Sequence, residues 1–144
     1  MYFEDIKLGM SVETEPRQIK KENMIAFAHE YDPLRIHTDE EYAKGSVFGT
    51  LIAPGVMSFM SVWAKFLELD FFGDELVAGK STKIEWFKPV HANDVLKGKA
   101  AITGLTEYSS RNGLVEITME VFNQLGELVL TDVTEVFIKC RPLV

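Results

Sequence analysis

Asp32 and His37 are the residues of this chain whose types and spacing best suit acid–base chemistry. A carboxylate and an imidazole can share one water, because the carboxylate takes a proton while the imidazole orients the remaining lone pairs. The two residues lie five apart with Pro33 between them, so they cannot be neighbours on one helix face. A loop can still bring them together. The alternative is structural: Asp32 caps a turn and His37 is an ordinary loop histidine.

Gly55 is the second candidate, because it follows Ala53-Pro54 and opens a very apolar helical segment. The first amides of a helix have no intrahelical acceptor and carry a partial positive charge, which can stabilise a developing oxyanion. Taken in isolation, the pair favours a structural explanation, since Pro-Gly is common at a turn and in the first helical turn.

Other chemistry has less support in the sequence. Three histidines without H-x-x-x-H spacing and the single Cys140 give no metal-site pattern, and we expect neither a metal nor a cofactor. Ser58 and Ser61 lack the G-x-S-x-G context of a nucleophile elbow. The glycines form no phosphate-binding loop. Arg35 either contacts a phosphate or stays solvated.

Helical patterns flank the Asp32–Asp39 stretch. Residues 20–31 have apolar side chains at helical spacing, and the following Asp32-Pro33 ends that helix because proline disfavours the helical region for the residue before it. Thr38 and Glu41 match the T-x-x-E capping box, which predicts a short helix over residues 42–44 that stops at Gly45.

Residues 56–69 predict a long, buried helix. Its polar residues step by three, four and three, so they form one narrow stripe on an otherwise apolar cylinder: Ser58, Ser61, Lys65 and Glu68. Such a helix must be covered on several sides. In a chain of this size a curved sheet is the natural cover.

Alternating patterns predict that sheet. Residues 115–121 alternate apolar and polar side chains most clearly, and residues 96–103 do so upstream of a turn at residues 109–113. Residues 76–87 and 128–140 are further strands, and residues 11–19 form a weak edge strand because of Pro16. The prediction is an α+β fold in which an antiparallel sheet wraps around one central helix.

The bulk properties limit the possible partners and location. The 144 residues suit a single domain over residues 1–144, and the net charge of −7 disfavours non-specific attraction to nucleic acid or to an anionic membrane. No signal peptide pattern opens the chain, and the longest apolar run is too short and too polar to span a bilayer. We therefore expect a cytoplasmic protein.

Taken together, three ordered segments resemble MaoC-like dehydratases, the hot-dog-fold relatives of (R)-specific enoyl-CoA hydratases. The resemblance spans nearly the whole chain. It is carried by Phe27-Ala28 with Asp32-Pro33 and His37-Thr38-Asp39, by Phe48-Gly49 with Ile52-Ala53-Pro54-Gly55, and by Phe87-Lys88-Pro89-Val90 with Asn93-Asp94-Val95-Leu96.

The resemblance implies roles for individual residues. Asp32 and His37 match the catalytic acid–base pair, and Gly55 matches the residue whose amide contacts the thioester oxygen. The residues expected to bind substrate are Arg35, Pro54 and Phe48. This sequence departs from the family pattern at Leu34-Arg35, at Pro54 and at Asn93, which replaces a glycine. The first two departures bear on substrate identity.

The activity implied by the resemblance is reversible hydration of 2-enoyl thioesters of coenzyme A or an acyl carrier, without a cofactor. A homodimer or a larger assembly of dimers is also implied, with sheets joined edge to edge, the site at the interface, and Trp86 and Phe87 lining an acyl pocket. An acyl-CoA thioesterase is the alternative enzyme, because one fold hosts both reactions. Thioesterases of this fold usually place an acid on the central helix, where this chain offers only Glu68. A non-catalytic acyl-thioester-binding subunit is the third possibility.

Overall fold

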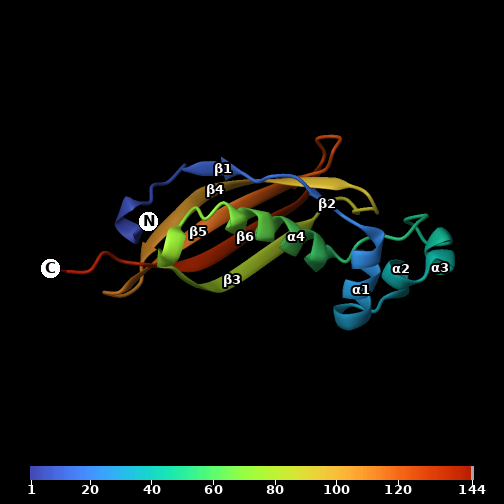
Figure 1. Ribbon diagram of the computed structural model, residues 1–144, viewed down its shortest axis with the longest axis horizontal. Coiled ribbons are helices and arrows are strands. Elements are labelled where there is room, and N and C mark those ends of the chain that lie inside the picture. The colour runs from blue at the N-terminus through green and yellow to red at the C-terminus, as the bar shows by residue number, and fades with distance from the viewer. Residues whose placement is uncertain (144) are drawn as a thin grey trace.

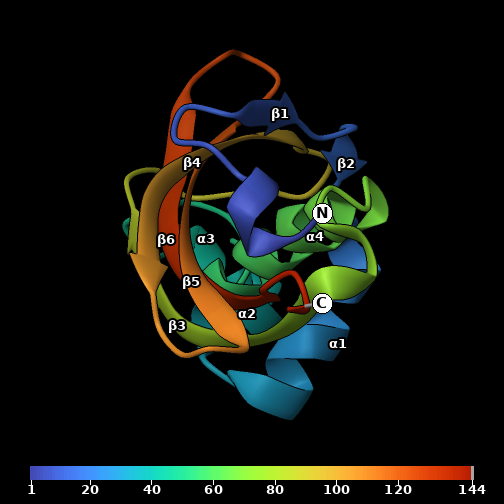
Figure 2. The ribbon, with the colours of Figure 1, turned by 90° about the vertical axis from the view of Figure 1, so that its left-hand side faces the viewer.

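The apolar helix α4 (Gly55–Glu68) lies across one face of an antiparallel sheet in a computed structural model that describes residues 1–143 (Figure 1). Its buried side includes Phe59, Val62 and Phe66, each of which contributes roughly 1.5–3 kcal/mol by leaving water. The predicted helix over residues 56–69 is confirmed, shifted by one residue at each end. Viewed end on, the sheet curls around α4 (Figure 2), as a helix apolar on most sides requires.

The sheet contains every strand that alternation predicted. The long strands are β3 (Leu76–Trp86), β4 (Val95–Glu107), β5 (Asn112–Phe122) and β6 (Leu128–Lys139). With the short edge strand β1 (Ser11–Glu13), their order in the sheet is β1-β4-β5-β6-β3. On β5, Val115, Ile117 and Met119 are buried beneath the helix. Gly98 of β4 marks a close approach, since a Cβ there would lie 2.5 Å from Val62 Cγ1.

Pro16 divides the predicted edge strand into two pieces. β1 (Ser11–Glu13) and β2 (Arg17–Gln18) both pair with β4, and Pro16 lies in the gap between them. Proline cannot donate to a ladder, so the interruption follows from the sequence. A 3-10 turn, η1 (Phe3–Asp5), precedes β1, and a second, η2 (Gly73–Glu75), leads into β3.

Three short helices form the end of the molecule next to the start of α4 (Figure 1): α1 (Lys21–Tyr31), α2 (Arg35–Thr38) and α3 (Glu40–Lys44). The sequence did not predict α2. The predicted capping box is wrong, because Thr38 ends α2 and its hydroxyl donates to Leu34 O at 3.3 Å. Asp39 caps α3 instead and accepts from the Tyr42 N–H at 3.1 Å. Aspartate caps a helix at least as well as threonine does, so placing the N-cap one residue later costs little.

The backbone conformation explains Asn93, one of the departures from the family pattern. Its φ is 73°, in the left-handed region that glycine adopts freely and that asparagine tolerates better than most residues. The next residue, Asp94, accepts from the His91 N–H at 2.8 Å and closes this turn before β4. Asparagine therefore replaces glycine without changing the chain path.

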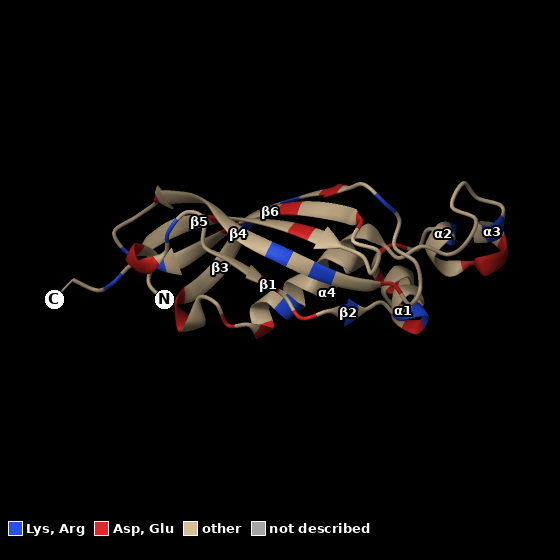
Figure 3. Ribbon diagram, turned by 90° about the horizontal axis from the view of Figure 1, so that it is seen from above, with Lys and Arg blue, Asp and Glu red and all other residues tan. Residues whose placement is uncertain are grey.

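Charged residues are distributed over the whole molecule. Seen from above, basic segments on β4 lie beside acidic segments of the neighbouring strand, and both signs occur on α4 and on the end formed by α1–α3 (Figure 3). Within residues 1–143, no helix is long and apolar enough to cross a membrane.

Candidate active site

Asp32 and His37 meet because the chain turns sharply between α1 and α2. Asp32 ends α1, and its N–H bonds Ala28 O at 2.9 Å. Before Pro33 its backbone leaves the helical region as expected, but with φ −156° and ψ 69° it is not fully extended. α2 then brings His37 back, so that Nε2 lies 3.3 Å from Asp32 Oδ2. The predicted approach of the two side chains is observed. His37 is buried, whereas 41% of the Asp32 side chain is exposed.

The other imidazole nitrogen determines what His37 can donate. Nδ1 lies 2.7 Å from Ile52 O, and a carbonyl oxygen only accepts, so Nδ1 carries a hydrogen. In the neutral ring, Nε2 then presents its lone pair on the side of Asp32. In the charged ring, Nε2 donates to the carboxylate. Ile52 N–H also bonds Ile36 O at 3.2 Å, which fixes α2 to the segment before α4.

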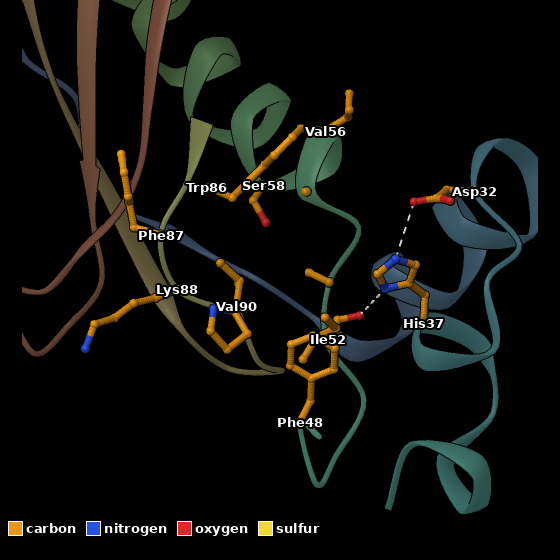
Figure 4. A pocket seen from close by; sticks show the side chains of 13 residues that line it. Asp32, His37, Phe48, Ile52, Val56, Ser58, Trp86, Phe87, Lys88 and Val90 are labelled. Atoms are coloured by element: carbon orange, nitrogen blue, oxygen red, sulfur yellow. Dashed lines mark hydrogen bonds and ion pairs between the residues drawn. The ribbon is translucent and has the colours of Figure 1, made fainter. Parts of the chain in front are cut away.

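The pair lies at the wall of a mostly apolar cavity of about 440 Å³ (Figure 4). A cavity with apolar walls and a few convergent polar groups is the usual form of a small-molecule site. The lining residues are Asp32, His37, Phe48, Ile52, Ala53, Gly55, Val56, Ser58, Trp86, Phe87, Lys88, Pro89 and Val90.

Gly55 lines the same cavity as the acid–base pair. It is the first residue of α4, so its N–H has no intrahelical acceptor. The indole of Trp86 packs directly against it, because a Cβ at Gly55 would lie 2.5 Å from both Nε1 and Cε2. The glycine therefore has a packing reason in addition to any chemical one.

The expected substrate-binding residues fall into two groups. Phe48 lines the cavity, as do Trp86 and Phe87. Pro54 is the N-cap of α4 beside the cavity, without lining it. Arg35 points elsewhere: it pairs with Asp39 at 3.3 Å, and its guanidinium carbon lies 4.2 Å from the centre of the Tyr42 ring. Contact between Arg35 and a substrate stays a prediction.

Ser58 and Lys88 were not predicted as site residues. Lys88 forms an ion pair with Glu127 at the cavity, and this hydrogen bond, together with one from Asn123, lowers the pKa of the Glu127 carboxyl. Ser58 lacks a nucleophile motif, but the sequence offers another signal for it. Its position three residues after Gly55 places both on one helix face, which is the sequence signal that identifies it.

Residues 5–124, most of the chain, match the MaoC like domain. The chain belongs to this family. Its hot-dog architecture, an antiparallel sheet wrapped around a helix, is that of the solved MaoC-like proteins.

Solved relatives of this MaoC-like chain superpose over most of their length. A monoamine oxidase regulatory protein from Archaeoglobus fulgius is 28% identical with a TM-score of 0.94, covering 99% of this chain and 96% of that one. A MaoC-like dehydratase from Rhodospirillum rubrum is 28% identical with a TM-score of 0.85, covering 99% of both. The HadBC (3R-hydroxyacyl-ACP dehydratase) complex from Mycobacterium tuberculosis is 25% identical with a TM-score of 0.76, covering 90% of this chain and 96% of that one.

Proposed function

We propose that this chain catalyses the reversible hydration of 2-enoyl thioesters, and in reverse the dehydration of 3-hydroxyacyl thioesters. The observation that carries the proposal is the contact between Asp32 and His37 in the cavity that the Gly55 amide also borders. Membership of the MaoC-like family supports hydration or dehydration of acyl thioesters in general. The acyl group, and the choice of coenzyme A or a carrier protein, belong to the proposal.

The hydrogen-bonding capacity of the pair explains how it would hold a water. Because Nδ1–H is committed to Ile52 O, a neutral His37 offers only an acceptor at Nε2, and a carboxylate at Asp32 also only accepts. A water that donates one hydrogen to each has its oxygen lone pairs directed away from both. Those lone pairs are then free to attack an electrophilic carbon in the cavity.

In the hydration that we propose, every atom of the water and of the 2-enoyl thioester is kept in the product. The water oxygen bonds to C3 while one O–H bond breaks and its proton passes to Asp32. The electron pair of the C2–C3 double bond moves toward the thioester oxygen, which accepts from the Gly55 N–H. The proton held by the Asp32–His37 pair then passes to C2, and the 3-hydroxyacyl thioester leaves. Dehydration follows the same steps in reverse.

A panel of 2-enoyl-CoA esters of increasing chain length tests the proposal. Conjugated absorbance and free thiol are followed in parallel. We expect absorbance to fall without release of thiol. Thiol release would instead indicate a thioesterase, and binding without either change would indicate a non-catalytic subunit. Either result would overturn the hydratase proposal.

The position of Glu68 gives the thioesterase alternative little support. Glu68 is the last residue of α4, at the opposite end from Gly55, and it pairs with Lys65 at 3.1 Å. Among residues 1–143, the cavity lining includes no acid from α4. The acid and the thioester site would therefore be far apart.

We also propose that the active form is a homodimer joined through β3. β3 is the last strand in the sheet order, so one of its edges is unpaired within the part of the chain described. The neighbouring face of α4 exposes Val56, Met60 and Leu67, next to half-exposed Trp86. Exposed apolar surface beside a free strand edge is typical of an interface, and the M. tuberculosis relative is a complex.

Light scattering at micromolar concentration tests the assembly. We expect twice the chain mass for the wild type and a monomer for Met60→Glu, which places a charge in the proposed interface. Lys139→Glu, at the end of β6, is the matched control and should remain dimeric. A wild-type monomer would contradict the dimer.

A further inference from the structure

Ser58 carries a hydroxyl in the wall of the catalytic cavity that the protein itself leaves almost without a partner. The residue is only 1% exposed, and in the close-up its oxygen points into the cavity between Trp86 and Ile52 (Figure 4). Within residues 1–143, its acceptor is Pro54 O at 3.5 Å, the outer limit for a hydrogen bond. Pro54 O already accepts from the Ser58 N–H at 3.1 Å.

Ser61, one turn further along α4, shows what a satisfied serine looks like in the same helix. Its hydroxyl donates to Met57 O at 2.8 Å, which is the ordinary bond from a helical serine to the carbonyl four residues earlier. The corresponding acceptor for Ser58 is Pro54 O, but at 3.5 Å the bond is hardly formed. The hydroxyl of Ser58 therefore keeps most of its donor capacity for something else.

Leaving a buried hydroxyl underused is costly. A polar group removed from water without a good partner destabilises the folded state. Most of the wall around Ser58 is apolar, including Val56, Trp86 and Val90, and these neighbours offer the hydroxyl no alternative acceptor. The cavity itself is the remaining direction for the hydroxyl hydrogen.

Ser58 also shares a helix face with the proposed oxyanion donor. Gly55 and Ser58 are three residues apart at the start of α4, and both border the cavity. An oxygen bound at the Gly55 N–H therefore lies within the region that the Ser58 hydroxyl faces. Two donors directed at one oxygen stabilise developing negative charge more than one donor does.

We propose that the Ser58 hydroxyl is a second hydrogen-bond donor to the thioester oxygen, beside the Gly55 N–H. This inference rests on the proposed hydratase function and adds a catalytic residue to it. Ser58 donates its hydrogen bond as charge moves onto that oxygen, and no covalent bond to Ser58 forms or breaks. The bond is stronger in the transition state than in the bound substrate, so its loss affects turnover more than binding.

Steady-state kinetics of Ser58→Ala with a matched control tests this role. Because loss of one oxyanion donor costs on the order of a hundredfold in kcat, we expect a fall of that size with little change in KM. Ser61→Ala, the control on the next turn, should keep wild-type kinetics. Ser58→Thr retains the hydroxyl and should restore much of the activity. Equal melting temperatures for the variants show that folding is not the cause.

A spectroscopic signature separates donation from packing. The Asp32→Asn variant should bind a conjugated dienoyl-CoA without hydrating it. Hydrogen bonds to the carbonyl oxygen polarise the bound ligand, so it absorbs at longer wavelength than in solution. We expect the Ser58→Ala/Asp32→Asn double variant to lose a large part of this shift. An unchanged shift would overturn the inference.

The results separate a failure of the proposed Ser58 role from a failure of the proposed hydratase function. If the wild type hydrates enoyl-CoA esters and Ser58→Ala has the same kcat, Ser58 is a packing residue and the hydratase function stands. If the wild type hydrates none of the panel, the proposed function fails, and the inference fails with it.

Discussion

The carboxyl groups of Asp32 and Asp132 differ in their exposure and in their partners. Asp32 lies at the cavity with 41% of its side chain exposed and an imidazole nitrogen 3.3 Å away. Asp132, on β6, is completely buried, and its hydrogen-bond partner is the Thr134 hydroxyl, at 2.7 and 2.9 Å from its two oxygens. Burial raises the pKa of Asp132 to about 6, although the bond from Thr134 opposes the rise.

The difference shows that an unusual carboxyl environment does not by itself make a catalytic group. Asp132 does not border the cavity that contains His37 and Gly55, so it has no substrate to act on there. Asp32 has both a partner and an open side. The comparison therefore supports the role that we propose for the accessible acid, Asp32, and attributes a cost in stability to the buried acid, Asp132.

The largest expected effect is on turnover. Asp32→Asn keeps the shape of the side chain and removes the base, so kcat should fall about a hundredfold or more. His37→Gln should do the same because it removes the Nε2 acceptor. Asp132→Asn is the matched control and should turn over close to the wild type. Full activity in Asp32→Asn, or a large loss in Asp132→Asn, would reverse the assignment.

The next effect is on stability and its dependence on pH. The pKa of Asp132 in the folded chain lies above its ordinary value of 3.8, so the folded state binds this proton more tightly. That contribution is complete below the ordinary value and is lost as pH rises through about 6. Asp132→Asn avoids the loss and should be more stable than the wild type by on the order of 2 kcal/mol at neutral pH.

Chemical denaturation at a series of pH values measures this difference. The advantage of Asp132→Asn should shrink as pH is lowered through the folded pKa. A constant advantage at every pH would mean that the substitution acts through packing and not through the charge.

A smaller effect is expected at Thr134, which also contacts the Thr82 hydroxyl at 3.0 Å. Thr134→Val keeps the shape and leaves the Asp132 carboxyl without its donor, so it should cost about 1–3 kcal/mol. In the Asp132→Asn background the same substitution should cost less, because no charge is left unpaired. Equal costs in the two backgrounds, measured as unfolding free energies, would mean that the pair is not coupled.

The smallest effect concerns an exposed acid, Asp39. The Tyr42 N–H, and after it Arg35, lowers the pKa of this carboxyl, so its contribution is present above the ordinary value and disappears as pH falls. Asp39→Ala should lower the melting temperature slightly at neutral pH and not at all in acid. Thr38→Val should matter less. The reverse order would restore Thr38 as the cap.

Local patterns were enough to predict most of the fold. The alternation on β5, the break at Pro16 and the apolar helix α4 each depend on residues near one another in the chain. The proximity of Asp32 and His37 was also predictable in outline. α2 was missed because four residues give no period to detect, and the cap was misplaced because Thr38 and Asp39 are both good capping residues.

Contacts between distant segments were not predictable. Trp86 fills the space beside Gly55 only because β3 passes the start of α4. The burial of Asp132 depends on the packing of α4 over β6, and in the sequence it is one polar residue in an alternating strand. The weak bond of Ser58 depends on tenths of an ångström that no pattern contains.

The bonds around Ile52 have a consequence for dynamics. Its carbonyl fixes His37, its amide bonds Ile36 O, and the next amide, that of Ala53, bonds Val90 O at 2.8 Å. Opening of the α1–α3 end must break the first two bonds together, whereas the third can persist. Hydrogen exchange at the Ile52 amide therefore reports how often the α1–α3 end, with the acid–base pair, separates from the segment before α4, and its protection relative to Ala53 gives the free energy of local opening.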